Sequence, residues 1–219
     1  MFKKLLLTLV FIPLTTIANT DNMQTAQAQL KALLEQNKSY IASKGSEFFA
    51  MKSKGQNPDI TLVSCADSRV HTSIIDETPE GNLFIIKNIG NQIATAQGSV
   101  KFGVNHLHTP LLLILGHSQC GAITAATHAH TGLEPSIVKE LESLDLKLGE
   151  PNIKGVIQNV NNQVASALKT FDKQVKNNEL LIVGAVYDFS NDMKLGAGQL
   201  NVINIQGKPV NPLNPEKAS

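Results

Sequence analysis

Two short segments of the sequence carry side chains that can bind a metal ion. Cys65 follows the apolar run ITLVS, and His117 and Cys120 follow the apolar run LLLIL. Thiolate sulfur and imidazole nitrogen are ligands that zinc prefers, and three protein ligands leave a fourth coordination position open. A helix beginning near Gly121 favours a thiolate at Cys120 through its dipole. These residues therefore predict a catalytic zinc site, provided that the fold brings the two segments together.

The same cysteines permit a second interpretation. The chain contains 2 cysteines, and if the protein is exported to an oxidising compartment, a single pair forms a disulfide by default. A disulfide between Cys65 and Cys120 explains neither His117 nor the charged residues Asp67 and Arg69. The zinc site is therefore favoured, and the disulfide remains the alternative.

Asp67 and Arg69 alternate with Cys65 in the segment CADSR. If this loop is extended, the three side chains project to the same side, because side chains alternate with a period of two. A carboxylate beside a metal can orient a water molecule, and a guanidinium can bind that carboxylate with two parallel hydrogen bonds. An ordinary surface ion pair is the alternative, but the position directly after a candidate ligand favours a role in the site.

The segments around these residues alternate between strand and helix patterns. Apolar runs predict strands at 60–64, 83–87, 111–115, 180–187 and 200–205, and helical spacing is found at 25–44, 99–108 and 153–171. Such alternation is typical of an α/β fold with a mainly parallel β-sheet flanked by helices. Because open α/β sheets bind ligands at the carboxyl ends of their strands, Cys65 and His117 are expected at one edge of the sheet.

The composition is that of a globular chain without a strong charge bias. Of its 219 residues, 42% are hydrophobic and 17% are charged, and the formal net charge is +1. Nucleic-acid binding requires clustered basic charge, which this sequence does not show, so nucleic acid is not an expected partner.

The first twenty residues have the order of parts of a secretory signal peptide. Lys3 and Lys4 precede an apolar stretch at 5–18, which ends in small residues. The stretch is shorter than the roughly 20 residues that a membrane-spanning helix needs. We therefore expect a signal peptide at 1–18, cleaved at about 18–20, and a single domain at 21–219. The mature protein is expected to be exported without a membrane anchor, and to be periplasmic in a Gram-negative source; a buried N-terminal helix is the alternative.

Four motifs together resemble those of the β-class carbonic anhydrases. They are CADSRV, KNIGN, GHSQCGA and GAVYD, and their order and spacing agree over residues 45–205. The resemblance implies reversible hydration of CO2 to bicarbonate and a proton by a homodimer or homotetramer with one Zn2+ per subunit. It implies that Cys65, His117 and Cys120 are zinc ligands and that Asp67 and Arg69 form a catalytic dyad. Some family members also use this aspartate as a fourth ligand, so Asp67 is a conditional zinc ligand.

The resemblance has departures and leaves alternatives. The family usually has arginine where Lys87 stands and serine where Ala66 stands, and lysine lacks the planar fork of arginine. A zinc-bound hydroxide is the expected nucleophile, and two thiolates with Asp67 nearby predict activity that rises toward alkaline pH. A related zinc hydrolase acting on carbonyl sulfide or carbon disulfide remains possible. So does a non-catalytic protein with a closed zinc site or a disulfide.

Overall fold

The computed structural model describes residues 15–215, with side chains from residue 21 onward. The chain divides into two compact units, Met1–Gly55 and Gln56–Ser219. The predicted signal peptide at 1–18 lies largely outside the described residues. That peptide, its cleavage and the domain at 21–219 therefore stay predictions.

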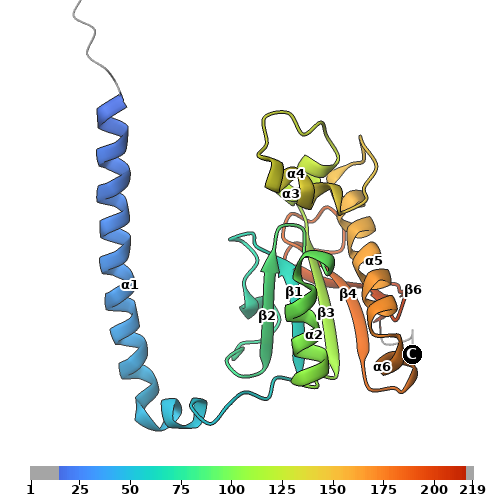
Figure 1. The fold of residues 1–219 in the computed structure, drawn as a ribbon, viewed down its shortest axis with the longest axis horizontal. Coiled ribbons are helices and arrows are strands. Elements are labelled where there is room, and N and C mark those ends of the chain that lie inside the picture. The colour runs from blue at the N-terminus through green and yellow to red at the C-terminus, as the bar shows by residue number, and fades with distance from the viewer. Residues whose placement is uncertain (1–14, 216–219) are drawn as a thin grey trace, which may run out of the picture. The chain divides into compact units, whose positions relative to one another are not determined.

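The first unit contains one long helix, α1 (Thr15–Lys52), drawn in blue in Figure 1. Gly45 interrupts it with a φ of 76° and a ψ of 168°, a left-handed φ that glycine adopts without steric cost. The sequence predicts a helical segment at 25–44, which agrees with the interruption at Gly45. Within residues 15–215, no helix is both long enough and apolar enough to cross a membrane.

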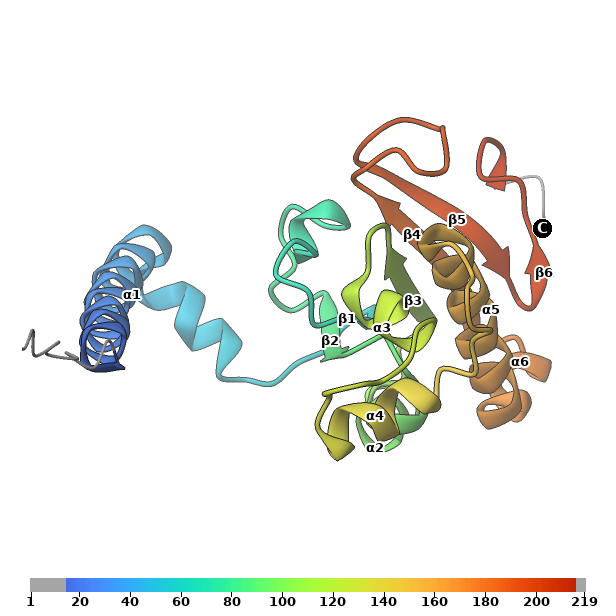
Figure 2. The ribbon, with the colours of Figure 1, turned by 90° about the horizontal axis from the view of Figure 1, so that it is seen from above.

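The second unit is built on a six-stranded sheet with the order β2-β1-β3-β4-β5-β6 (Figures 1 and 2). The strands are β1 (Ile60–Cys65), β2 (Leu83–Asn88), β3 (Leu111–His117), β4 (Leu181–Asp188), β5 (Gln199–Ile205) and β6 (Lys208–Pro209). β1 to β4 are parallel, whereas β5 pairs with β4 and β6 pairs with β5 in antiparallel fashion. The predicted α/β fold with a mainly parallel sheet is confirmed.

Helices connect the parallel strands. They are α2 (Gln97–Lys101), a π-helical turn (Phe102–His106), α3 (Gly121–Ala126), α4 (Pro135–Glu142), α5 (Asn152–Thr170) and α6 (Asp172–Lys176), with short 3-10 turns at Thr72–Ile74 and Ala94–Ala96. Helix α5 has the apolar spacing that the sequence shows between 153 and 171. One of its faces is buried through residues that include Val156, Val160 and Val164.

The core lies on both faces of the sheet. On one face, α2 and α5 pack over buried side chains that include Val63 and Ile114 (Figure 2). On the other, the segment at 70–75 covers Leu62 and Leu115. Close packing under α5 depends on Gly184, where a Cβ atom would lie 2.7 Å from Val160 Cγ1. This packing fixes the ends of β1 and β3, where the candidate ligands lie.

Candidate metal centre

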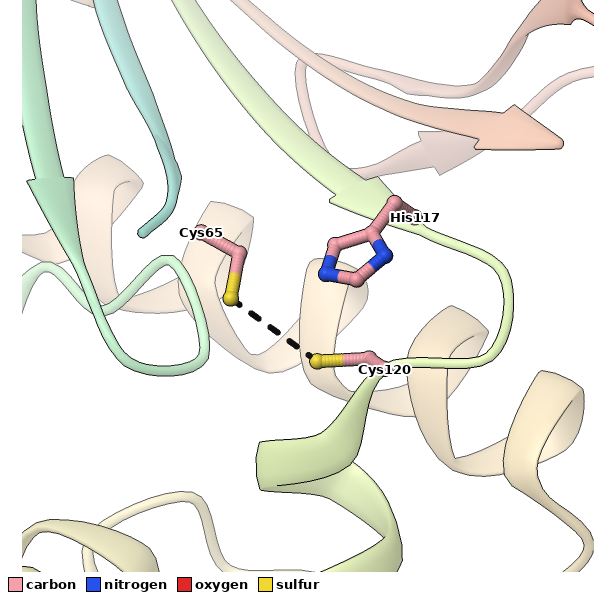
Figure 3. Close-up of side chains that lie close together, drawn as sticks. All are labelled: Cys65, His117 and Cys120. Carbon is pink, nitrogen blue, oxygen red and sulfur yellow. Dashed lines mark hydrogen bonds between the residues drawn. The ribbon is translucent and has the colours of Figure 1, made fainter. Parts of the chain in front are cut away.

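Three potential ligands converge at the carboxyl edge of the sheet. Cys65 is the last residue of β1 and His117 the last of β3, while Cys120 is the N-cap of α3. The two strands are parallel neighbours. The ligand atoms of the three residues all lie within 4.8 Å of one another, and their side chains point toward a common centre (Figure 3). The fold therefore brings together the two segments, as the sequence predicts.

The imidazole of His117 is prepared to bind a metal through one nitrogen. Its side chain is buried, and Nδ1 lies 2.9 Å from the carbonyl oxygen of Ser118. Because a carbonyl can only accept, Nδ1 carries the proton and Nε2 presents a lone pair. Nε2 is buried without a hydrogen-bond partner, which is rare for a polar atom. This lone pair beside two sulfur atoms fits a zinc ion.

The two cysteines are free thiols in this structure. Their sulfur atoms are 3.9 Å apart, well beyond the roughly 2.05 Å of a disulfide bond. The thiol of Cys120 lowers the pKa of Cys65, and His117 acts in the same direction against the effect of burial. Cys65 in turn raises the pKa of Cys120, because the Cys120 thiol keeps its proton as a hydrogen-bond donor to the Cys65 sulfur; burial and the repulsion between two thiolates act in the same direction. A divalent cation would offset that repulsion and stabilise both thiolates.

Asp67 lies beside this cluster and is paired with Arg69. Nε of Arg69 donates to Oδ1 at 2.8 Å and Nη2 donates to Oδ2 at 2.7 Å. These bonds hold the pKa of Asp67 well below its usual range. Asp67 Oδ2 is 3.8 Å from Nε2 of His117, close enough to face a group bound at the centre. Both carboxylate oxygens are engaged by Arg69, and the role of Asp67 as a fourth ligand stays a prediction.

The loop that carries this pair turns rather than remaining extended. The backbone N–H of Arg69 donates to Oδ1 of Asp67 at 2.9 Å, and the N–H of Val70 donates to the Asp67 carbonyl at 3.1 Å. An aspartate that accepts from the backbone two residues later forms an Asx turn. The premise of an extended loop is therefore wrong, and the local turn brings Asp67 and Arg69 together instead.

Two contacts to Arg69 were not predicted from the sequence. Its guanidinium lies 4.7 Å from the ring centroid of Phe189, and Nη2 donates to the carbonyl of Gln119 at 3.1 Å. The Phe189 ring also stacks on His117, with centroids 5.9 Å apart. Phe189 directly follows the GAVYD motif, but a single aromatic residue after a strand end belongs to no repeating pattern from which its contacts could be predicted. Phe189 thus contacts both Arg69 and the candidate ligand His117.

Lys87 supports the loop from the neighbouring strand β2. Its Nζ donates to the carbonyl of Val70 at 2.6 Å and to that of Cys65 at 3.3 Å. The lysine thus spans both ends of the loop that carries Asp67 and Arg69. The departure from the usual arginine preserves a charged donor at this place.

A cavity of about 400 Å³ lies at the opposite edge of the sheet. Its lining comes from the segments that precede β3 and β4, and includes Asn105, Thr109, Gln174 and Glu179. None of the three candidate ligands lines it, so this cavity is not part of the metal centre.

Comparison with known proteins agrees with this geometry. The family model for carbonic anhydrase matches residues 60–194, which include the three ligands and the Asp67–Arg69 pair. The chain belongs to the carbonic anhydrase family. Carbonic anhydrase 2 of Mycobacterium tuberculosis is 37% identical over 109 residues, which are 47% of this chain and 53% of that protein. The chain therefore spans about half the length of that relative.

Solved structures show the same fold. The β-carbonic anhydrase CcaA is similar with a TM-score of 0.69 at 22% identity, covering 83% of this chain and 88% of that one. A tetrameric β-carbonic anhydrase from the filamentous ascomycete Sordaria macrospora has a TM-score of 0.64 at 21% identity, covering 84% and 98%. This member of the carbonic anhydrase family therefore has the β-class fold.

Proposed function

We propose that this protein is a zinc-dependent enzyme that interconverts CO2 and bicarbonate. The observation that carries the proposal is the buried cluster of Cys65, His117 and Cys120, in which Nε2 of His117 lacks a hydrogen-bond partner. Membership of the carbonic anhydrase family supports the same reaction. Zinc held by these residues supplies the acidification of a water molecule for attack on CO2.

The residues around the cluster have separable roles in this proposal. Arg69 holds both carboxylate oxygens of Asp67 in place, and its hydrogen bonds lower the pKa of that carboxyl. The Asp67 carboxylate accepts a hydrogen bond from the nucleophile and thereby orients it. His117 keeps the Nδ1–H tautomer through the Ser118 carbonyl, so Nε2 remains available as a ligand.

The test combines metal content with catalysis on the same preparation. Zinc is quantified and CO2 hydration is followed by stopped flow near pH 7 and near pH 8.5. We expect about one zinc per chain and faster hydration at the higher pH, because two thiolates raise the pKa of bound water. Zinc without hydration at either pH would overturn the proposed reaction, and turnover of carbonyl sulfide alone would reassign the substrate. Absence of zinc with both thiols oxidised would instead support the disulfide.

A matched pair of variants isolates the role of Asp67. Asp67→Asn is expected to retain zinc and to lose hydration by roughly 100-fold or more. Asp76→Asn is the control, because Asp76 also accepts a backbone N–H two residues later, from Thr78 at 2.8 Å, but belongs to no candidate ligand set. Equal rates in the two variants would contradict the assignment of Asp67.

The cellular context is part of the proposal. Residues 1–18 are proposed to direct export, so the mature enzyme would work outside the cytoplasm and, in a Gram-negative source, in the periplasm. A mature N-terminus near residues 19–21, determined on protein recovered from that compartment, is the expected result. An intact N-terminus on cytoplasmic protein would contradict it.

We also propose that the enzyme is a homodimer or homotetramer. The tetrameric relative from Sordaria macrospora supports an oligomer of this kind. Light scattering on the purified protein should give two or four chains, and a monomer at micromolar concentration would overturn this proposal.

A further inference from the structure

We propose that Asn152 is a positioning residue for the zinc ligand Cys120. The side-chain amide of Asn152 pairs with both backbone polar groups of this cysteine. The Cys120 N–H donates to Oδ1 at 3.2 Å, and Nδ2 donates to the Cys120 carbonyl at 2.8 Å. The inference rests on the proposed function in that Cys120 is taken to bind zinc.

The paired hydrogen bonds act at a place where the backbone needs support. Cys120 lies between β3 and α3, and the preceding residue, Gln119, has a left-handed φ of 53°. The Cys120 N–H and carbonyl belong to the two peptide groups that flank its Cα, and the carbonyl also accepts from the Thr124 N–H at 3.0 Å. The Asn152 amide holds both peptide groups and so helps to define the backbone orientation at this residue. That orientation sets the Cα–Cβ direction, and therefore the place of Sγ beside Cys65 and His117.

Asn152 is itself held on a rigid element. It is the first residue of α5, and its Nδ2 also lies 2.7 Å from Oγ1 of Thr124 in α3. The first turn of α5 lies close to α3, because a Cβ atom on Gly155 would lie 2.7 Å from Cγ2 of Ile123. The side chain thus ties the ligand to the helix that packs along the sheet.

Asn162 provides a matched control within the same helix. It is also a half-buried asparagine, and its Nδ2 donates to the backbone carbonyls of Leu144 at 3.2 Å and Asp145 at 3.3 Å. These contacts tie α5 to a loop that carries none of the three ligands. Both Asn152→Ala and Asn162→Ala remove hydrogen bonds that anchor α5, so any general loss of stability should be similar in the two variants. Only Asn152→Ala should change zinc binding.

The test measures zinc affinity by competition with a chromophoric chelator on the full chain, alongside thermal unfolding with and without zinc. Asn152→Ala is expected to weaken zinc binding by about 10- to 100-fold, as is usual when a residue supporting a metal ligand is removed. Asn162→Ala is expected to remain within about twofold of the wild-type affinity. Equal affinity in the two variants would overturn the proposal.

Asn152→Asp serves if the alanine variant does not fold. Aspartate preserves the size of the side chain and the acceptor for the Cys120 N–H, but places an oxygen against the Cys120 carbonyl. An added negative charge near zinc by itself strengthens binding, so weaker binding would report the lost donor, and unchanged or tighter binding would overturn the proposal.

If the wild-type chain binds no zinc, the proposed function fails. If it binds zinc and hydrates CO2 but neither Asn152 variant binds more weakly, this inference alone fails.

Discussion

Arg69 engages both carboxylate oxygens of Asp67, with Nε 2.8 Å from Oδ1 and Nη2 2.7 Å from Oδ2. The guanidinium is itself held by the Gln119 carbonyl and the ring of Phe189. Asp67 is therefore held toward the candidate metal centre, with Oδ2 3.8 Å from Nε2 of His117. Arg69 thus sets the direction of this carboxylate and lowers its pKa.

Replacing Arg69 by lysine should reduce CO2 hydration with little change in zinc content. Lysine keeps the charge but cannot bind both oxygens of Asp67 with a planar fork, so the carboxylate is less well oriented. We expect a fall of about 10- to 100-fold in kcat/KM, measured by stopped flow on zinc-quantified protein. The double variant with Asp67→Asn should lose little more than Asp67→Asn alone, because both changes remove the same interaction. A wild-type rate in Arg69→Lys would contradict this dependence.

The Asp67–Arg69 pair should stabilise the fold in a pH-dependent way. The pKa of Asp67 is lowered in the folded state, mainly by the Arg69 hydrogen bonds, so the pair contributes stability above the unfolded pKa of about 4. This contribution is lost as the pH falls through the lower folded pKa. The difference in unfolding free energy between wild type and Asp67→Asn should be constant above about pH 5 and shrink below about pH 4. Denaturant titrations at several pH values measure it.

Arg69→Gln is the control for this pH dependence. It removes the main cause of the lowered pKa of Asp67, so its stability should decline less steeply in acid than that of the wild type. All three proteins are measured free of zinc, with a chelator present, so that loss of zinc in acid does not enter the differences. A difference between wild type and Asp67→Asn that grows as the pH falls would have the wrong sign for this account.

The candidate metal centre was largely predictable because its potential ligands lie at or just after the ends of buried strands. Parallel strands covered on both faces are continuous apolar runs, such as LLLIL, and their ends meet at one edge of the sheet. The four-motif resemblance then specified Cys65, His117 and Cys120, and the structure places their ligand atoms together.

The supporting contacts were not predictable from the sequence in the same way. Asn152 and Lys87 donate to backbone carbonyls of residues that lie 32 and up to 22 positions away. Such bonds depend on the tertiary arrangement, and no repeating pattern of residue types in the sequence marks them. The turn at Asp67 was missed for a different reason. The Asp67 carboxylate accepts a hydrogen bond from the Arg69 N–H, and this local bond favours a turn over the extended backbone that the alternation assumes.

A methyl group at Gly184 should destabilise the fold through the contact between β4 and α5. A Cβ atom there would lie 2.7 Å from Val160 Cγ1 and 2.9 Å from Val164 Cγ2, which is too close for ordinary packing. Gly184→Ala is therefore expected to cost about 1–3 kcal/mol in urea unfolding. Gly98→Ala, at a helical position with no atom within 4 Å, should be neutral or stabilising by up to about 1 kcal/mol. Equal stability of the two variants would contradict the packing argument.

Lys87 should affect both zinc binding and turnover through the loop that it spans. Its Nζ donates to the carbonyls of Val70 at 2.6 Å and Cys65 at 3.3 Å, so Lys87→Met removes a charged donor from both ends. We expect weaker zinc binding and about a tenfold lower hydration rate, because this loop carries the Asp67–Arg69 pair and begins directly after the candidate ligand Cys65. Lys87→Arg should retain most of both, and Lys101→Met, at an exposed lysine in α2, should change neither. If Lys87→Met matches Lys101→Met in chelator competition and in stopped flow, the loop holds its geometry without this lysine.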